Sequence, residues 1–224
     1  MPSRSCRADR RSRQVWDEGP GSNLTPVEGR LSGGRLTLAG RRGVGLGRIS
    51  SALIMPVSVA NSQIVFNALK DNGVRIMSAL PETWLVHLIR MAEDDPDTTL
   101  VRLAKEEEGV GISMGAHLAG VKSAMLMQNH GFLASVNGIV SGAQLYRIPL
   151  LMLISHRGSF GERDPWQTEG GGVTEEVLRA LRIAYDRLDE PATAAERIGG
   201  AVTLAEASLR PVALLLGRSL MWQE

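Results

Sequence analysis

Apolar positions follow two alternating patterns from about residue 55 to the end of the chain. A period of 3.6 residues is typical of amphipathic helices, and short, nearly continuous apolar runs are typical of buried strands. The first pattern predicts helices over 58–72, 81–93, 106–119, 132–146 and 191–209. The second predicts strands over 74–79, 98–102, 123–127, 149–155, 183–188 and 211–217. The stretch 158–172 is rich in glycine and charge and predicts a loop, after which Thr174 is expected to cap a short helix.

Six strands interleaved with helices predict an α/β fold. The sheet should be doubly wound, six-stranded and mainly parallel, with helices on both faces and right-handed crossovers. Ligands of such sheets bind beyond the carboxyl ends of the strands. The loops to inspect are therefore 80–82, 104–107, 128–132 and 156–161.

The first 54 residues differ from the rest of the chain. They hold ten Arg, no Lys, four acidic residues and nine Gly, and they show neither apolar period. This composition predicts a disordered leader. Because Met55 opens the first periodic segment, a mis-assigned start with translation from Met55 is an equal alternative. A transit peptide fits less well because acids and glycines interrupt any amphipathic helix. Residues 55–224 are expected to form one domain.

Composition excludes several classes of function. A net charge of +1 over 224 residues argues against a chain-wide nucleic-acid surface. No run of 18 apolar residues exists that would predict a membrane span. Cys6 is the only cysteine, which excludes an internal disulfide and a thiolate zinc cluster and fits a cytoplasmic protein. The Rossmann, P-loop and HExxH motifs are absent from the predicted domain.

The predicted helix 106–119 has an unusual composition. It opens with Glu106, Glu107 and Glu108, and small residues occupy seven of the next twelve positions. The glutamates alone fit solvated residues at the positive end of a helix. Each helical glycine, however, costs about 1 kcal/mol relative to alanine. We therefore expect a partner helix or a ligand to approach this backbone closely.

A second polar cluster follows the predicted strand 123–127. Gln128, Asn129 and His130 stand in a row before Gly131. They could satisfy backbone groups at the end of the strand. They could equally converge with a carboxylate to form a site.

Three blocks of sequence together carry a family resemblance. They are Glu106-Glu-Glu-Gly-Val-Gly-Ile-Ser-Met-Gly-Ala-His-Leu-Ala-Gly120, Met125-Leu-Met-Gln-Asn-His-Gly131 and Pro149-Leu-Leu-Met-Leu-Ile-Ser-His-Arg-Gly158. Over about residues 58 to 218 the chain resembles sulfopyruvate decarboxylase alpha subunits. More broadly it is similar to the pyrimidine-binding domain of thiamine diphosphate decarboxylases, including phosphonopyruvate decarboxylase.

The resemblance implies specific roles for residues of this chain. A glutamate nine residues before a glycine hydrogen-bonds the aminopyrimidine ring of the cofactor in that family, and Gly115 assigns this role to Glu106. Its carboxylate would promote loss of the proton on the thiazolium carbon, which glutamine could not do. Four further residues are implied at the cofactor, namely Pro81, Glu82, Gln128 and Asn129.

Substrate contacts are expected from His130 and Arg157, because a sulfonate or phosphonate needs Arg, His or amide donors. His130 stands where related sequences usually have serine, which could alter substrate choice or supply a proton. For Arg157, an ion pair with Glu162 or Asp164 is an equal alternative.

The resemblance also shows what this chain lacks. The family holds the diphosphate and Mg²⁺ through Gly-Asp-Gly and a later Asn, whereas none of the nine Asp here stands between two glycines. No metal ligand is therefore assigned to this chain. A separate beta subunit is implied to hold that end of thiamine diphosphate, in an α2β2 or larger assembly.

Two classes of function remain open. The first is a catalytic alpha subunit that decarboxylates 3-sulfopyruvate to sulfoacetaldehyde, with phosphonopyruvate or another 2-oxo acid as the rival substrate. The second is a non-catalytic interaction subunit. The presence of Glu106 favours the first, and the departure at His130 keeps the second open.

Overall fold

The computed structural model describes residues 56–223, so the predictions for the first 54 residues lie outside the described part. Six strands form one parallel sheet in the order β2-β1-β3-β4-β6-β5. In chain order the strands are β1 (Val74–Ala79), β2 (Thr99–Arg102), β3 (Lys122–Gln128), β4 (Leu150–Ser155), β5 (Ala184–Leu188) and β6 (Pro211–Leu216). The predicted six-stranded α/β sheet is confirmed, and every strand pair in it is parallel.

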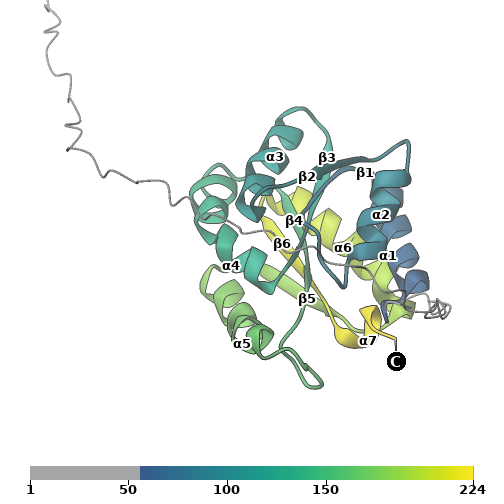
Figure 1. Cartoon of the computed structure of the whole chain (residues 1–224). Coiled ribbons are helices and arrows are strands. Elements are labelled where there is room, and N and C mark those ends of the chain that lie inside the picture. The colour runs from purple at the N-terminus through teal and green to yellow at the C-terminus, as the bar shows by residue number, and fades with distance from the viewer. Residues whose placement is uncertain (1–55, 224) are drawn as a thin grey trace, which may run out of the picture. The chain divides into compact units, whose positions relative to one another are not determined.

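Helices cover both faces of the sheet (Figure 1). One face carries α1 (Val59–Asp71), α2 (Val86–Asp94) and α6 (Pro191–Ser208), with the short α7 (Arg218–Met221) at its end. The other carries α3 (Glu106–Leu118), α4 (Asn129–Gly138) with its π-helical continuation η1 (Ile139–Gln144), and α5 (Pro165–Ala180). The fold is therefore doubly wound.

The central strands feed two hydrophobic cores because their successive side chains point to opposite faces. In β3, Ala124 and Leu126 pack against the α1 side, while Met125 and Met127 pack against the α3 side. All six residues of β4 are buried, and so are all six of β6. Both strands are nearly continuous apolar runs, as expected for parallel strands covered on both faces.

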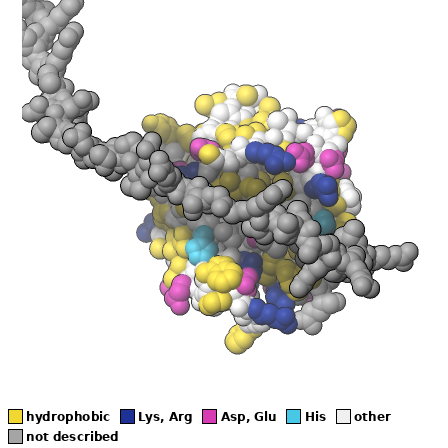
Figure 2. Space-filling view, in the orientation of Figure 1, with side chains coloured by type: hydrophobic (Ala, Val, Ile, Leu, Met, Phe, Trp, Pro, Cys, Tyr) yellow, Lys and Arg dark blue, Asp and Glu magenta, His cyan; other side chains and the backbone are white. Residues whose placement is uncertain are grey.

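The surface mixes charges of both signs. Figure 2 shows acidic and basic side chains close to one another across one face of the molecule, with apolar groups between them. The most exposed large apolar side chains are Phe160, Leu118, Trp166, Leu145 and Tyr146. Among residues 56–223, no helix combines the length and apolarity needed to cross a bilayer.

The helix that contains Thr174 differs most from its prediction. The stretch expected to be a loop up to residue 172 enters α5 already at Pro165, whose fixed φ suits the first turn of a helix. Thr174 consequently lies inside α5, where its hydroxyl donates to the Gly170 carbonyl, and it does not cap the helix. Gly171 carries no side chain, so the backbone of Arg157 can pass directly against α5. The glycines here serve close packing rather than loop flexibility.

Three other elements also depart from their predicted limits. Helix α2 begins at Val86 instead of residue 81, because Glu82 closes a turn by accepting a 2.8 Å hydrogen bond from the Leu85 N–H. Helix α4 begins at Asn129, directly after β3, instead of at residue 132, and its last part is π-helical. The short helix α7 was not predicted.

Candidate functional site

The three glutamates that open α3 have different partners. The Glu108 carboxylate accepts hydrogen bonds from the backbone N–H groups of Ala104 (2.9 Å) and Lys105 (3.4 Å), and so closes the N-terminus of the helix. Glu107 pairs with Lys105 at 2.6 Å and accepts from the Asn137 amide at 3.3 Å. The hydrogen bond from Lys105 is the main reason why the pKa of Glu107 is lowered.

Glu106 is the glutamate of this group whose carboxylate stays available. Within residues 56–223 it makes no hydrogen bond or ion pair, although the side chain is half-buried. It lies against the first turn of α4, where a Cβ built on Gly131 would stand 2.6 Å from its Cγ and 2.8 Å from its Oε1. The structure therefore places an unpartnered carboxylate beside the segment Gln128–Gly131.

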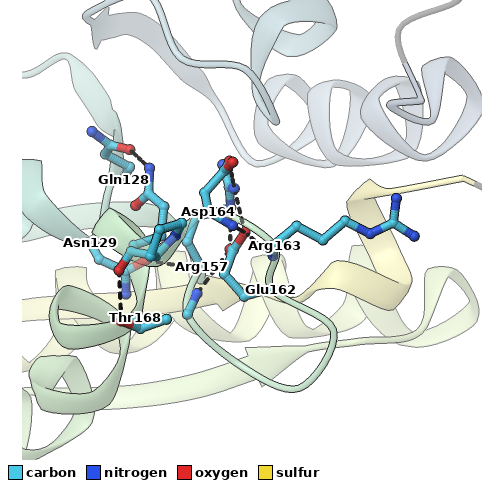
Figure 3. Close-up of polar contacts among 10 residues, drawn as sticks. Gln128, Asn129, Arg157, Glu162, Arg163, Asp164 and Thr168 are labelled. Carbon is cyan, nitrogen blue, oxygen red and sulfur yellow. Dashed lines mark hydrogen bonds and ion pairs between the residues drawn. The ribbon is translucent and has the colours of Figure 1, made fainter.

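Gln128 is the last residue of β3 and Asn129 is the first residue of α4, and their side chains have different hydrogen-bond partners (Figure 3). Asn129 is fully buried; its Nδ2 donates to the Thr174 hydroxyl and its Oδ1 accepts from the Arg157 N–H, both at 2.7 Å. Its amide joins the start of α4 to α5 and to the loop after β4, and both of its polar atoms are bonded within the protein. Gln128 is half-buried, and its Oε1 accepts from the Gln167 amide at 3.1 Å.

His130 is exposed and lies beside α5. A Cβ on Gly170 would stand 2.7 Å from its Cε1 and 2.8 Å from its Nε2, so the imidazole packs on the bare backbone of that glycine. His130 lies in the same turn of α4 as Gly131, but its ring faces α5, whereas Gly131 faces the Glu106 side chain.

Arg157 is held by two carboxylates of the loop that precedes α5 (Figure 3). It donates from Nε and Nη2 to Glu162 at 2.7 Å each, and Nη2 also reaches Asp164 at 2.7 Å. Its guanidinium lies 4.9 Å from the ring centroid of Trp84. The hydrogen bonds from Arg157 lower the pKa of Glu162 to about 2. The structure thus forms the ion pairs that the sequence offered as an alternative to substrate contact.

Pro81 and Glu82 follow β1, the strand between β2 and β3, and so share the sheet edge from which Glu106 and Gln128 extend. Both line an open cavity of about 430 Å³ together with residues of α2 and β2. Burial raises the pKa of Glu82, whose carboxylate faces the Leu85 N–H inside its turn.

Gln167 is a residue of this region that the sequence analysis did not select. It is 6% exposed, and while its amide nitrogen binds Gln128, its Oε1 is buried without a hydrogen-bond partner. Its signal in the sequence was the pair Asp164-Pro165, which marks the start of a helix and places Gln167 in the first turn.

These residues fit one end of an aromatic, nitrogen-containing cofactor. A half-buried carboxylate that makes no hydrogen bond or ion pair within residues 56–223 can accept a hydrogen bond from a protonated ring nitrogen, and the neighbouring amides add polar contacts. In the described part of the chain, no three His, Cys, Asp or Glu side chains are grouped so as to hold a metal ion. Glu106 is therefore the residue best placed to bind such a ring.

Comparisons with known proteins show the family of the chain. Residues 60–175 match the family described as thiamine pyrophosphate enzyme, N-terminal TPP binding domain. The chain is 38% identical to the sulfopyruvate decarboxylase subunit alpha of Methanothermobacter thermautotrophicus over 71% of this chain and 97% of that protein. It is 36% identical to the same subunit of Methanococcus maripaludis over 72% of this chain and 96% of that protein.

More distant relatives were also found. The phosphonopyruvate decarboxylase of Streptomyces viridochromogenes is 30% identical over 54% of this chain and 32% of that protein. Among solved structures, a 2-oxoglutarate:ferredoxin oxidoreductase from Magnetococcus marinus is similar with a TM-score of 0.57 and 18% identity. The match covers 75% of this chain and 30% of that one. At this identity the structural likeness supports the fold alone.

Proposed function

Because the chain belongs to the thiamine pyrophosphate enzyme family, among the sulfopyruvate decarboxylase alpha subunits, we propose that it serves the decarboxylation of 3-sulfopyruvate. The reaction takes up one proton and yields sulfoacetaldehyde and carbon dioxide. The single observation that carries this proposal is the unpartnered Glu106 carboxylate at the head of α3.

The cofactor supplies a thiazolium ring that accepts the electron pair released when carbon dioxide leaves. Glu106 would bind the pyrimidine ring of that cofactor and hold a proton at its ring nitrogen. The contacts of the two neighbouring glutamates support the choice of Glu106, because Glu107 pairs with Lys105 and Glu108 accepts a hydrogen bond from the backbone. Gln128 would add an amide contact, and Asn129 would hold its neighbours in place from the buried side.

Pro81 and Glu82 complete the proposed cofactor end from the neighbouring strand β1. Their support is their position, since β1 lies between the strands that precede Glu106 and Gln128. Because its pKa is raised, the Glu82 carboxyl group would keep its proton to a higher pH than an exposed glutamate does.

His130 is the proposed contact for the acidic group of the substrate. It is exposed in the first turn of α4, where its ring lies against Gly170 of α5, and a protonated imidazole can bind a sulfonate or phosphonate oxygen. Arg157 is also a proposed contact at this end of the substrate, but because Glu162 and Asp164 neutralise its charge it would act there by shaping the loop. Phosphonopyruvate is the alternative substrate, favoured by the relatives that carry that name.

A beta subunit is the proposed partner. The relatives are named as alpha subunits, and this chain contains no Gly-Asp-Gly sequence for the diphosphate and Mg²⁺. The partner would hold both, and an α2β2 or larger assembly would form the complete site.

The test is reconstitution. The chain alone should release no carbon dioxide from sulfopyruvate, and the chain with a beta subunit, thiamine diphosphate and Mg²⁺ should do so. Glu106→Gln should lose about 100-fold or more of kcat, whereas Glu107→Gln should keep it. Turnover by the isolated chain would contradict the partner, and an active Glu106→Gln complex would contradict the role of the carboxylate.

A further inference from the structure

Side chains of α3 pack against three glycines of α4 and η1. A Cβ on Gly131 would meet Glu106, one on Gly138 would stand 3.0 Å from the Glu107 Cγ, and one on Gly142 would stand 2.8 Å from the Met114 sulfur. The missing side chains let α3 and α4 pack closely, and the contact at Gly131 differs from the other two because its neighbour is Glu106.

Glu106 fills the space that a side chain at 131 would need. The three atoms nearest to a Cβ there all belong to Glu106, namely Cγ at 2.6 Å, Oε1 at 2.8 Å and Cδ at 2.9 Å. Non-bonded carbon atoms normally lie about 3.5–4.0 Å apart. A methyl group at this position would therefore displace the Glu106 side chain by roughly 1 Å.

We propose that Gly131 is a positioning residue for Glu106: its lack of a side chain fixes where the carboxylate lies. The inference rests on the proposed function of Glu106. In it, the Glu106 side chain packs against the backbone of α4 at Gly131, and this contact determines where the carboxylate lies. No hydrogen bond within the described residues fixes the Glu106 carboxylate, so its contact with the Gly131 backbone is what restricts it. Gly131 acts through Glu106 and touches neither substrate nor cofactor in this role.

The decisive variant is Gly131→Ala in the complex with the beta subunit. A displacement of about 1 Å at a catalytic group can cost about 100-fold, so kcat should fall about 10- to 100-fold while the KM for sulfopyruvate changes little. Gly138→Ala is the matched control, because it adds the same methyl group to the same helix against Glu107 and should keep kcat within about twofold. Gly200→Ala in α6, whose Cβ would meet nothing within 4 Å, controls for the substitution itself.

An unfolding cycle on the full-length chain tests the contact without cofactor or substrate. Gly131→Ala should lower the midpoint of thermal unfolding relative to wild type. In a Glu106→Ala background the same change should leave the midpoint unchanged or raise it, because the space is then empty and alanine favours a helix. If Gly131→Ala fails to fold, a folded Glu106→Ala/Gly131→Ala protein gives the same answer.

Three results would overturn the inference. The first is a wild-type kcat in Gly131→Ala, and the second is a loss of kcat in Gly138→Ala equal to that in Gly131→Ala. The third is a stability penalty of the alanine at position 131 that is the same with and without the Glu106 side chain. Failure of both Gly131→Ala and Glu106→Ala/Gly131→Ala to fold counts as this third result. A wild-type complex that does not turn over sulfopyruvate would instead refute the proposed function, and the unfolding cycle would still decide whether Gly131 positions Glu106.

Discussion

Replacing Glu162 by glutamine should destabilise the chain strongly at neutral pH. Glu162 is 5% exposed in its side chain and accepts two hydrogen bonds of 2.7 Å from Arg157. These hydrogen bonds lower its pKa from 4.5 to about 2. At 1.36 kcal/mol per pKa unit, this difference corresponds to about 3 kcal/mol of the free energy of unfolding.

The pH dependence follows from the direction of this pKa change. A carboxyl group whose pKa is lower in the folded state stabilises fully above its unfolded pKa and loses that stabilisation as the pH falls toward its folded pKa. The contribution of Glu162 should be about 3 kcal/mol at pH 7, about 1 kcal/mol at pH 3 and close to zero below pH 2. Glu162→Gln removes this dependence, so the two proteins should converge in stability on acidification.

Urea unfolding of both proteins at pH 7, 5 and 3, followed by far-ultraviolet circular dichroism, measures the difference directly. Glu169→Gln is the control, because Glu169 is an exposed glutamate of α5, the helix that follows the loop containing Glu162. Its stability should stay within about 0.5 kcal/mol of wild type. A Glu162→Gln protein that loses less than about 1 kcal/mol at pH 7, or whose deficit stays constant down to pH 3, would refute the reasoning.

Three further predictions concern the site and its supports. Asn129→Ala should cost about 2–3 kcal/mol in thermal unfolding, because it leaves the buried Thr174 hydroxyl and the Arg157 N–H short of a partner; a loss below 1 kcal/mol would contradict this. Glu108→Ala should lower the stability of the chain by about 1 kcal/mol through loss of the N-terminal cap, with kcat of the complex unchanged. His130→Ser should change the ratio of kcat/KM between sulfopyruvate and phosphonopyruvate by about 10-fold or more, and an unchanged ratio would separate His130 from substrate choice.

The sequence predicted the sheet well because its signal is local. The apolar runs of β4 and β6 are buried on both faces in the structure, and a run of this kind is stable only in the middle of a covered parallel sheet. The end of the predicted helix 58–72 was equally clear, since Gly73 has a positive φ of 84° directly after α1 and Asn72. The first part of helix α5, before Thr174, was missed because its glycines and charges have no clear apolar period. Its stability comes from Pro165 at its start and from contact with the neighbouring loop.

By itself the sequence determined a six-stranded parallel α/β domain and a group of three glutamates at the head of one helix. These follow from residue types and periods, which act over a few neighbouring positions. Only the tertiary structure decided which glutamate is available, since Lys105 and Asn137 occupy Glu107, backbone N–H groups occupy Glu108, and Gly131 leaves room for Glu106. The contacts of Glu107 with Lys105 and of Glu108 with the backbone are local, but the Asn137 hydrogen bond and the Gly131 contact join α3 and α4 across more than twenty positions, where no local pattern in the sequence can specify them.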